Sequence, residues 1–163
     1  MGQVTSVPAA STEMTFRRIV FPGMLNANQI AFGGEILSFY DECSGIIGLN
    51  YRKGNLATVA IDDVSFTRPV HNGDVMVVRG RVVYAGRTSF SVRMWMDVEK
   101  NGEPLGPAGG AVYHYVALDE AGKPAPVPEL LLETEEDRLL WKEAELSRDL
   151  KKKRAELLKE SVC

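Results

Sequence analysis

The chain has 163 residues and is poor in several features that would place it in a large protein class. Its 2 cysteines, Cys43 and Cys163, form no CxxC pair and no Cys/His cluster. This excludes a disulfide framework and favours a reducing compartment. No run reaches the ~18 consecutive apolar residues that suggest a membrane span, and the first residues lack the basic and apolar segments of a secretory signal. We therefore expect a cytoplasmic protein without a membrane partner.

Positive charge is not in excess either. The 19 Lys and Arg residues stand against 22 Asp and Glu residues, which gives a net charge of −3. No basic field would attract a phosphate backbone, so nucleic acid is not an expected partner. HExxH and CxxC spacings are also absent, so we expect no metal site. What is present, 45% hydrophobic and 25% charged residues, is typical of a soluble globular protein.

Three segments differ in composition. Residues 1–12 contain little that would bury, and we expect them to be flexible. Residues 13–128 carry alternating apolar patterns and turn signals, and they should form one folded domain. Residues 129–163 are rich in Leu, Glu, Lys and Arg, and they should form a charged C-terminal helix.

The central segment predicts one strand, one helix and then a series of strands. Met14–Phe21 is predicted as a strand, and Gly33–Leu49 as a buried helix because it is apolar nearly all round. Short connections such as Gly86-Arg87 join the later strands, and strands joined so briefly must be antiparallel. The fold class is therefore α+β, with a curved antiparallel sheet wrapped around a central helix. The four later strands are predicted at Leu56–Phe66, Val75–Ala85, Thr88–Glu99 and Gly110–Leu118.

The C-terminal helix is predicted over Glu129–Glu160. Its leucines at positions 139, 146, 150 and 157 step by 7, 4 and 7 residues, which resembles a short heptad seam. We interpret it as a surface helix that lies across its own subunit or a neighbour, with a coiled coil as the alternative. The run 151–154 (KKKR) would offset the helix dipole and solvate one face.

The segment from Asn26 to Gly34, followed by Asp41, could carry chemistry. Gly33 and Gly34 stand where a loop meets a helix, and the first N–H groups of a helix are unpaired and partly positive. Asp41 lies about two turns further along, on a helix with few polar positions, where desolvation would raise the pKa of a carboxyl group. Two structural alternatives stay open. Asp41 could face water or pair with an arginine, and Asn26 could be a turn or capping residue.

Several short motifs occur in a fixed order over residues 14–128. They are Asn26-x-Asn28 with Phe32-Gly33-Gly34 and Asp41, then Thr58-Val59-Ala60-Ile61-Asp62, Phe66-x-Arg68-Pro69-Val70, Gly86-Arg87-Thr88-Ser89, and Tyr115-Val116-Ala117-Leu118-Asp119. In this succession the chain resembles the hotdog-fold acyl-CoA thioesterases, in particular their cytosolic acyl-CoA hydrolase branch.

This resemblance implies hydrolysis of acyl-CoA thioesters without a metal or organic cofactor. Asp41 would act as general base or nucleophile, Asn26 would position the water or the thioester carbonyl, and the Gly33 N–H would hold the oxyanion. The resemblance also implies that Asn26 and Asp41 meet across a homodimer interface, with a trimer of dimers as the full assembly. The residues implied to line the path of the substrate are Gly34, Thr58, Val59, Arg87, Thr88 and Ser89, with Arg87 a candidate for a CoA phosphate.

Two departures from the family pattern are Gln29, where glycine is common, and Glu35, where a large aromatic residue is common. Gln29 would have to be strained to follow a glycine-only loop conformation. The alternative function is therefore a non-catalytic acyl-CoA-binding or sensing module that uses its C-terminal helix to bind a protein. A hydratase ranks last because no histidine lies between Gly33 and Leu49. His71 and His114 show no nucleophile spacing, so a Ser-His-Asp triad is not expected.

Overall fold

A five-stranded antiparallel sheet forms the frame of the protein. We describe residues 5–160 from a computed structural model, and the strands follow the order β2-β4-β5-β6-β3. β5 and β6 are joined at Asn101 and Gly102, which both have positive φ. The predicted antiparallel sheet is confirmed, and β4, β5 and β6 follow one another as a meander. β3 was expected beside β4, but it pairs with β6 at the edge of the sheet, and β2 takes the place beside β4. The strands are β2 (Met14–Ile19), β3 (Asn55–Phe66), β4 (Val75–Ala85), β5 (Ser89–Lys100) and β6 (Glu103–Leu118).

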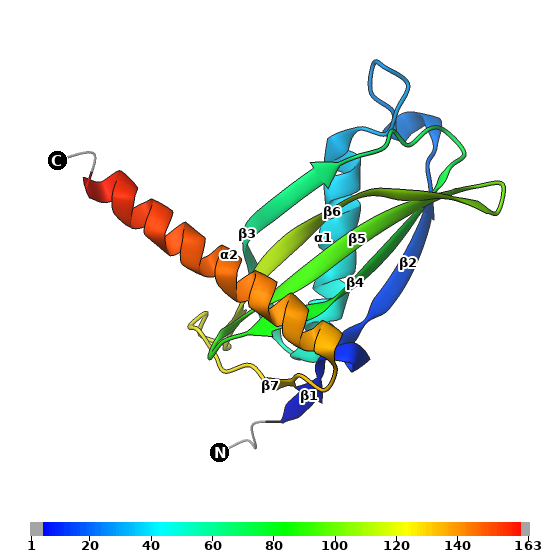
Figure 1. The fold of residues 1–163 in the computed structure, drawn as a ribbon. Helices are drawn as coiled ribbons and strands as arrows, with labels where there is room; N and C mark the ends of the chain where they lie inside the picture. The colour runs from blue at the N-terminus through cyan, green and yellow to red at the C-terminus, as the bar shows by residue number, and fades with distance from the viewer. Residues whose placement is uncertain (1–4, 161–163) are drawn as a thin grey trace.

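The central helix α1 (Gly33–Tyr51) covers one face of this sheet and supplies much of the core (Figure 1). Tyr40, Cys43 and Ile47 point from α1 into the core and are at most 1% exposed. Gly80 of β4 allows the close approach, because a Cβ atom there would lie 2.8 Å from the δ carbon of Ile47. The predicted central helix held by a sheet is therefore confirmed. The helix is not buried all round, however, because Ile46 and Leu49 on its other side are 44% and 49% exposed.

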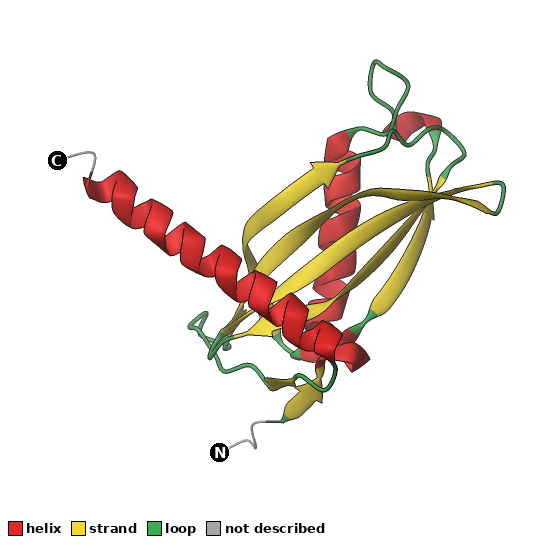
Figure 2. Ribbon diagram, in the orientation of Figure 1, coloured by secondary structure: helices red, strands yellow, loops and turns green. Residues whose placement is uncertain are grey.

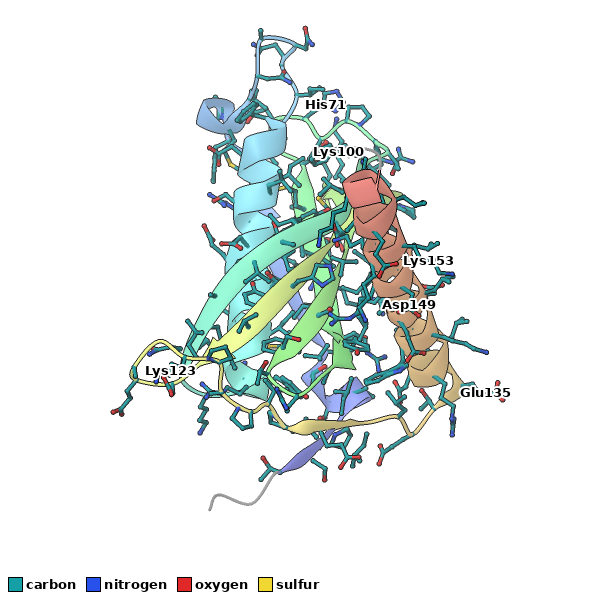
Figure 3. All side chains as sticks on the ribbon, turned by 90° about the vertical axis from the view of Figure 1, so that its left-hand side faces the viewer. His71, Lys100, Lys123, Glu135, Asp149 and Lys153 are labelled. Carbon is teal, nitrogen blue, oxygen red and sulfur yellow. The ribbon has the colours of Figure 1, made fainter. Side chains whose placement is uncertain are left out.

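The C-terminal helix α2 (Glu135–Glu160) covers the opposite face of the sheet (Figure 2). In the turned view of Figure 3 the sheet lies between α1 and α2. Arg81 of β4 is 3% exposed and forms a buried ion pair with Asp137, and this contact fastens the first turn of α2 to the sheet.

α2 begins later than predicted. The sequence predicts a helix from Glu129, but residues 129–131 form the short strand β7 (Glu129–Leu131). The helix starts after Thr134, whose hydroxyl accepts a hydrogen bond from the Asp137 N–H, while the Asp137 carboxylate accepts from the Thr134 N–H. This reciprocal pair is a capping box of the pattern T-x-x-D, and it fixes where the helix begins.

Residues 6–12, which belong to the segment expected to be flexible, form regular structure, and residues 1–4 of that segment lie outside the described residues. β1 (Ser6–Pro8) pairs in parallel with β7, and the 3₁₀ turn η1 (Ala9–Thr12) follows. Ala9 is 1% exposed, and the Thr12 hydroxyl donates to the Ala9 carbonyl and accepts from the Val82 N–H. A small residue and a satisfied hydroxyl can be buried, which the low hydrophobicity of this segment did not indicate. A second 3₁₀ turn, η2 (Pro22–Met24), follows β2.

Candidate active site

Asp41 lies in the middle of α1, next to the edge strand β3. The Thr58 hydroxyl donates a hydrogen bond to Asp41 Oδ1 at 3.3 Å. The Ser44 hydroxyl donates to the Asp41 carbonyl at 3.2 Å and lies 2.7 Å from the Tyr115 hydroxyl. These four side chains form one polar cluster between α1, β3 and β6. The cleft beside it is lined by Asp41, Gly45, Leu49, Gly54, Asn55, Leu56, Thr58, Tyr115 and Leu118.

The expectation that Asp41 is buried within the single chain is wrong, because its side chain is exposed. α1 turns its apolar face, with Tyr40 and Ile47, toward the middle of the sheet. Asp41 instead points toward β3, where the sheet ends and no further strand covers it. Any desolvation of this carboxylate must therefore come from outside the chain.

Two tyrosines of β6 frame the carboxylate. Burial raises the pKa of Tyr115, hydrogen bonds with Ser44 and Thr58 oppose this, and the negative charge of Asp41 raises it further. Burial and the charge of Asp41 also raise the pKa of Tyr113, whose hydroxyl donates to the Leu37 carbonyl at 2.8 Å. Both tyrosines therefore stay protonated at neutral pH, and the Tyr113 hydroxyl serves as a donor. Tyr113 and Tyr115 are separated by one residue, so they share one face of the strand, and this alternation was the available signal for their role.

A second cleft lies at the N-terminus of α1. It is lined by Asn26, Ile30, Ala31, Gly33, Ile36, Phe66, Thr67, Arg68, Pro69 and Val70. Asn26 Oδ1 accepts hydrogen bonds from the N–H groups of Asn28, at 2.9 Å, and Ile30, at 3.4 Å. The side-chain oxygen of Asn26 thus shapes its own loop, and its NH₂ group is the part that can serve a ligand.

The loop at Asn26 carries backbone strain. Gln29 has a φ of 59°, a left-handed conformation that glycine adopts without penalty. The Gln29 N–H donates to the Asn26 carbonyl at 3.0 Å, and this turn keeps the loop in place. The sequence-based expectation that Gln29 must be strained to follow the glycine path is therefore confirmed.

Gly33 and Gly34 open α1. The first helical hydrogen bonds run from Glu35 and Ile36 to the Phe32 carbonyl, so the N–H groups of both glycines precede them. A Cβ atom at Gly33 would lie 3.4 Å from the Phe66 ring, and one at Gly34 would lie 2.4 Å from the Phe32 ring. Gly33 thus lines the cleft at the start of α1, and aromatic rings occupy the space that a side chain would need at either glycine.

The two clefts have no lining residue in common. Asp41 and Thr58 line one of them, and Asn26 and Gly33 line the other. Within one chain the structure therefore does not bring Asn26 and Asp41 into a shared site.

The other predicted residues lie on β3 and on the connection between β4 and β5. Val59 is 58% exposed and is the extra residue of a β-bulge between Thr58 and Ala60. Arg87 is exposed and lines a third cleft, with Trp141 and residues 126–130. Thr88 and Ser89 are half-buried, and their carbonyls accept from Ala117 and Gly86. The hairpin residues are thus apart from the Asp41 cleft in the single chain.

A hydrogen-bonded Ser-His-Asp chain lies on the outer face of the sheet, although the sequence gave no reason to expect one. His114 Nδ1 lies 2.8 Å from the Ser91 hydroxyl, and His114 Nε2 lies 2.6 Å from Asp62 Oδ2, which also pairs with Lys151 of α2. Ser91 is fully buried, so no substrate carbonyl could reach its hydroxyl. The chain of contacts connects α2 to the sheet and has no nucleophilic role.

Within residues 5–160 no helix is long and apolar enough to cross a membrane. The same residues contain no group of three or more His, Cys, Asp or Glu side chains placed to hold a metal ion.

A central helix gripped by an antiparallel sheet, with a polar cluster at the sheet edge, defines a hotdog-fold protein. The Thioesterase superfamily profile matches residues 28–104. The acyl-CoA thioester hydrolase YciA of Salmonella typhimurium is 37% identical over 120 residues, which cover 71% of this chain and 90% of that protein. The chain therefore belongs to the Thioesterase superfamily.

Solved structures agree over most of the chain. The structure of an apo-hexameric acyl-CoA thioesterase has a TM-score of 0.86 and 30% identity, and the match covers 93% of this chain and 98% of that one. An acyl-CoA hydrolase from Staphylococcus aureus, solved with butyryl coenzyme A and coenzyme A, has a TM-score of 0.84 and 25% identity, and the match covers 96% of each chain. The cytosolic acyl coenzyme A thioester hydrolase of Rattus norvegicus is 28% identical over 128 residues, or 77% of this chain, which spans only 34% of that longer relative.

Proposed function

We propose that the protein hydrolyses acyl-CoA thioesters at a site shared by two subunits. The observation that carries this proposal is the division of the polar groups. Each chain holds a carboxylate in one cleft and an amide with a helix N-terminus in another. A partner that joins the two halves would complete the site and remove Asp41 from water.

The edge strand β3 supports such a dimer. Its apolar side chains Val59, Ile61, Val64 and Phe66 are between 40% and 58% exposed. An unpaired edge with apolar side chains is a template for pairing with another strand. Pairing of β3 with the same strand of a second copy would cover Asp41 and Thr58. It would also bring the loop with Asn26 of the partner subunit toward Asp41.

In this site the Asp41 carboxylate takes a proton from water, and the resulting hydroxide attacks the thioester carbonyl carbon. The Gly33 N–H at the positive end of α1 stabilises the oxyanion. The Asn26 NH₂ group donates to the carbonyl oxygen, since its own oxygen is held by the loop. The C–S bond then breaks, and the proton passes from Asp41 to the leaving CoA thiolate. The alternative is direct attack by the Asp41 carboxylate on the thioester carbonyl carbon, which breaks the C–S bond, releases the CoA thiolate and leaves an anhydride. Water then hydrolyses the anhydride, which frees the acid and restores Asp41.

The remaining predicted residues would hold the CoA moiety and the acyl chain. Arg87 is exposed and free to approach a phosphate, and Thr88 and Ser89 follow it in the same hairpin. Gly34, Thr58 and Val59 would line the path to Asp41. We propose that the reaction needs no metal or organic cofactor. A trimer of dimers remains our proposed assembly, and the cytoplasm our proposed location.

The experiment measures CoA release from acyl-CoAs of increasing chain length by the native protein and by the variants Asp41→Ala and Asn26→Ala. Both variants should lose nearly all turnover. The two inactive chains are then unfolded together and refolded as a mixture. If the site is shared, each mixed dimer holds one site with both residues intact and one site with neither. Random pairing makes half of the dimers mixed, so about a quarter of the native activity should return.

Two results would contradict the proposal. Undiminished hydrolysis by Asp41→Ala would contradict the catalytic role of Asp41. A mixture that stays inactive would contradict a site shared between two subunits. Tight acyl-CoA binding without turnover by the native protein would instead support the alternative of a non-catalytic binding module.

A further inference from the structure

The outer face of α2 carries a stripe of leucines whose surfaces are more than half exposed. Leu139, Leu146, Leu150 and Leu157 are 61%, 61%, 58% and 63% exposed. At about 100° per residue these positions fall within a narrow band along the helix. The opposite side of α2 contacts the sheet, where Trp141 stacks on Tyr84 and Arg148 lies over the same ring. The leucine stripe therefore points away from the sheet.

The spacing of the stripe is symmetric. Its steps of 7, 4 and 7 residues read the same in both directions, with the centre at position 148. In an antiparallel pair of α2 helices centred there, Leu139 lies opposite Leu157 of the partner subunit. In the same pair Leu146 lies opposite Leu150 of the partner subunit. These are the alternating core layers that a two-helix seam needs.

The charges of α2 are divided in a matching way. Residues 135–147 hold 5 acidic and 2 basic residues, whereas residues 148–160 hold 6 basic and 3 acidic residues. An antiparallel pair places the acidic half of one helix beside the basic half of the other, whereas a parallel pair would place like charges together. Glu143 and Lys153 border the stripe and would face each other across the pair. The acidic residues of the first half are Glu135, Glu136, Asp137, Glu143 and Glu145, and the basic residues of the second half are Arg148, Lys151, Lys152, Lys153, Arg154 and Lys159.

We propose that α2 is a self-association surface whose occupant is α2 of a second copy of this chain, packed antiparallel about position 148. Symmetric leucine spacing and complementary charge halves are what an isologous interface requires, because one patch must fit itself. The stripe faces away from the sheet, so this surface is distinct from the β3 edge. A chain with two different self-complementary surfaces can link dimers into a larger assembly. The shared catalytic site does not depend on this contact.

Charge reversal tests the orientation of the pair. Glu143→Lys alone and Lys153→Glu alone each place like charges together, so the affinity between copies should fall about tenfold. The double variant Glu143→Lys/Lys153→Glu restores opposite charges and should regain native assembly, measured by sedimentation velocity over a dilution series. Glu145→Lys is the matched control, since it makes the same charge change away from the stripe and should assemble like the native protein.

The rescue separates this proposal from effects inside one chain. Glu143 lies 4.0 Å from Arg93 of its own chain, and a loss caused by that contact would persist in the double variant. A double variant that stays impaired, or single variants that assemble like the native protein, would overturn the proposal.

Cysteine cross-linking gives a second readout, in a Cys163→Ser background. Chains with Leu139→Cys and chains with Leu157→Cys are mixed and oxidised. They should form a disulfide with each other and not with their own kind, because like positions in the antiparallel pair lie about 27 Å apart. Cross-links within each separate sample would show a parallel pair and overturn the proposal, as would the absence of any cross-link in the mixture.

Discussion

The Thr58 hydroxyl donates a hydrogen bond to the Asp41 carboxylate, and this contact joins the central helix to the edge strand of the sheet. Thr58 precedes the bulge at Val59, which offsets the register between β3 and β6. Bulges re-aim side chains next to functional sites. The carboxylate is therefore held in a fixed direction at the border of the chain, where a second copy can reach it.

Replacing Thr58 with valine should slow turnover. The variant keeps the shape of the side chain but removes the donor, and the loss of one hydrogen bond to a charged group, about 1.5 kcal/mol, corresponds to roughly a tenfold lower kcat. Thr58→Ser retains the hydroxyl and should stay within about threefold of the native rate. Steady-state kinetics with one acyl-CoA compares the three proteins. Equal kcat for valine and threonine would show that this contact does not position Asp41.

Replacing Gln29 with glycine should stabilise the fold. The residue sits at a φ of 59°, and a side chain in this region costs about 1 kcal/mol relative to glycine. For a chain of this size, that gain raises Tm by about 2 to 4 °C. Gln29→Ala is the matched control, because alanine keeps the strain and should not raise Tm. A glycine variant that melts at or below the native temperature would contradict the strain argument.

Replacing Asp137 with alanine should release α2 from the sheet. The substitution leaves the buried Arg81 guanidinium without its main partner and removes the capping box, at a cost of about 3 kcal/mol. Limited proteolysis should then cut within α2 well before it does in the native protein. Glu136→Ala removes an exposed carboxylate 3.8 Å from the same arginine and should cost less than about 1 kcal/mol. Similar behaviour of the two variants would rule out a special role of the buried pair.

Acid should weaken the attachment of α2. Burial lowers the pKa of His114, although Asp62 opposes this shift, so the unfolded chain takes up the proton first. The stability from this group is fully present above its usual pKa of 6.5 and is lost as the pH falls below that value. Urea unfolding between pH 8 and pH 5 should show the decline, and His114→Gln should flatten it. If the free energy of unfolding of His114→Gln falls with pH as steeply as that of the native protein, the decline comes from other groups.

Asp62 and Asp137 take part in the ion pairs that attach α2 to the sheet, and they make stability depend on pH in a lower range than His114 does. Burial alone would raise the pKa values of Asp62 and Asp137, but hydrogen bonds from Lys151 and His114, and from Thr134 and Arg81, lower both. Their contribution is present above their usual value of 3.8 and is lost as the pH falls through the lowered pKa values.

The strand series and the central helix could be predicted because local signals agree with the tertiary structure. The turn at Asn101-Gly102 and the alternation along β4 and β5 need no distant partner to be read. The start of α2 was missed because its leucine and glutamate content continues back to Glu129. The capping pattern from Thr134 to Asp137 was the better signal.

The site could be predicted only in its parts. Asn26, Gly33 and Asp41 stand out by residue type and position, whereas Ser44 and Tyr115 join Asp41 through a contact between α1 and β6. The exposure of Asp41 depends on which side of the helix meets the sheet edge. Helical periodicity identifies an apolar face but does not show where a sheet ends.

The pairing of β1 with β7 ties the first strand of the described chain to the segment that immediately precedes α2. Val7 of β1 lies beside Leu130 of β7. A recombinant fragment that stops at residue 128 would therefore lack β7, with which β1 pairs, as well as α2. A shortened chain that keeps both this pairing and the contact between Arg81 and Asp137 must extend at least through Asp137. Deletion studies of the helix should therefore cut after that residue.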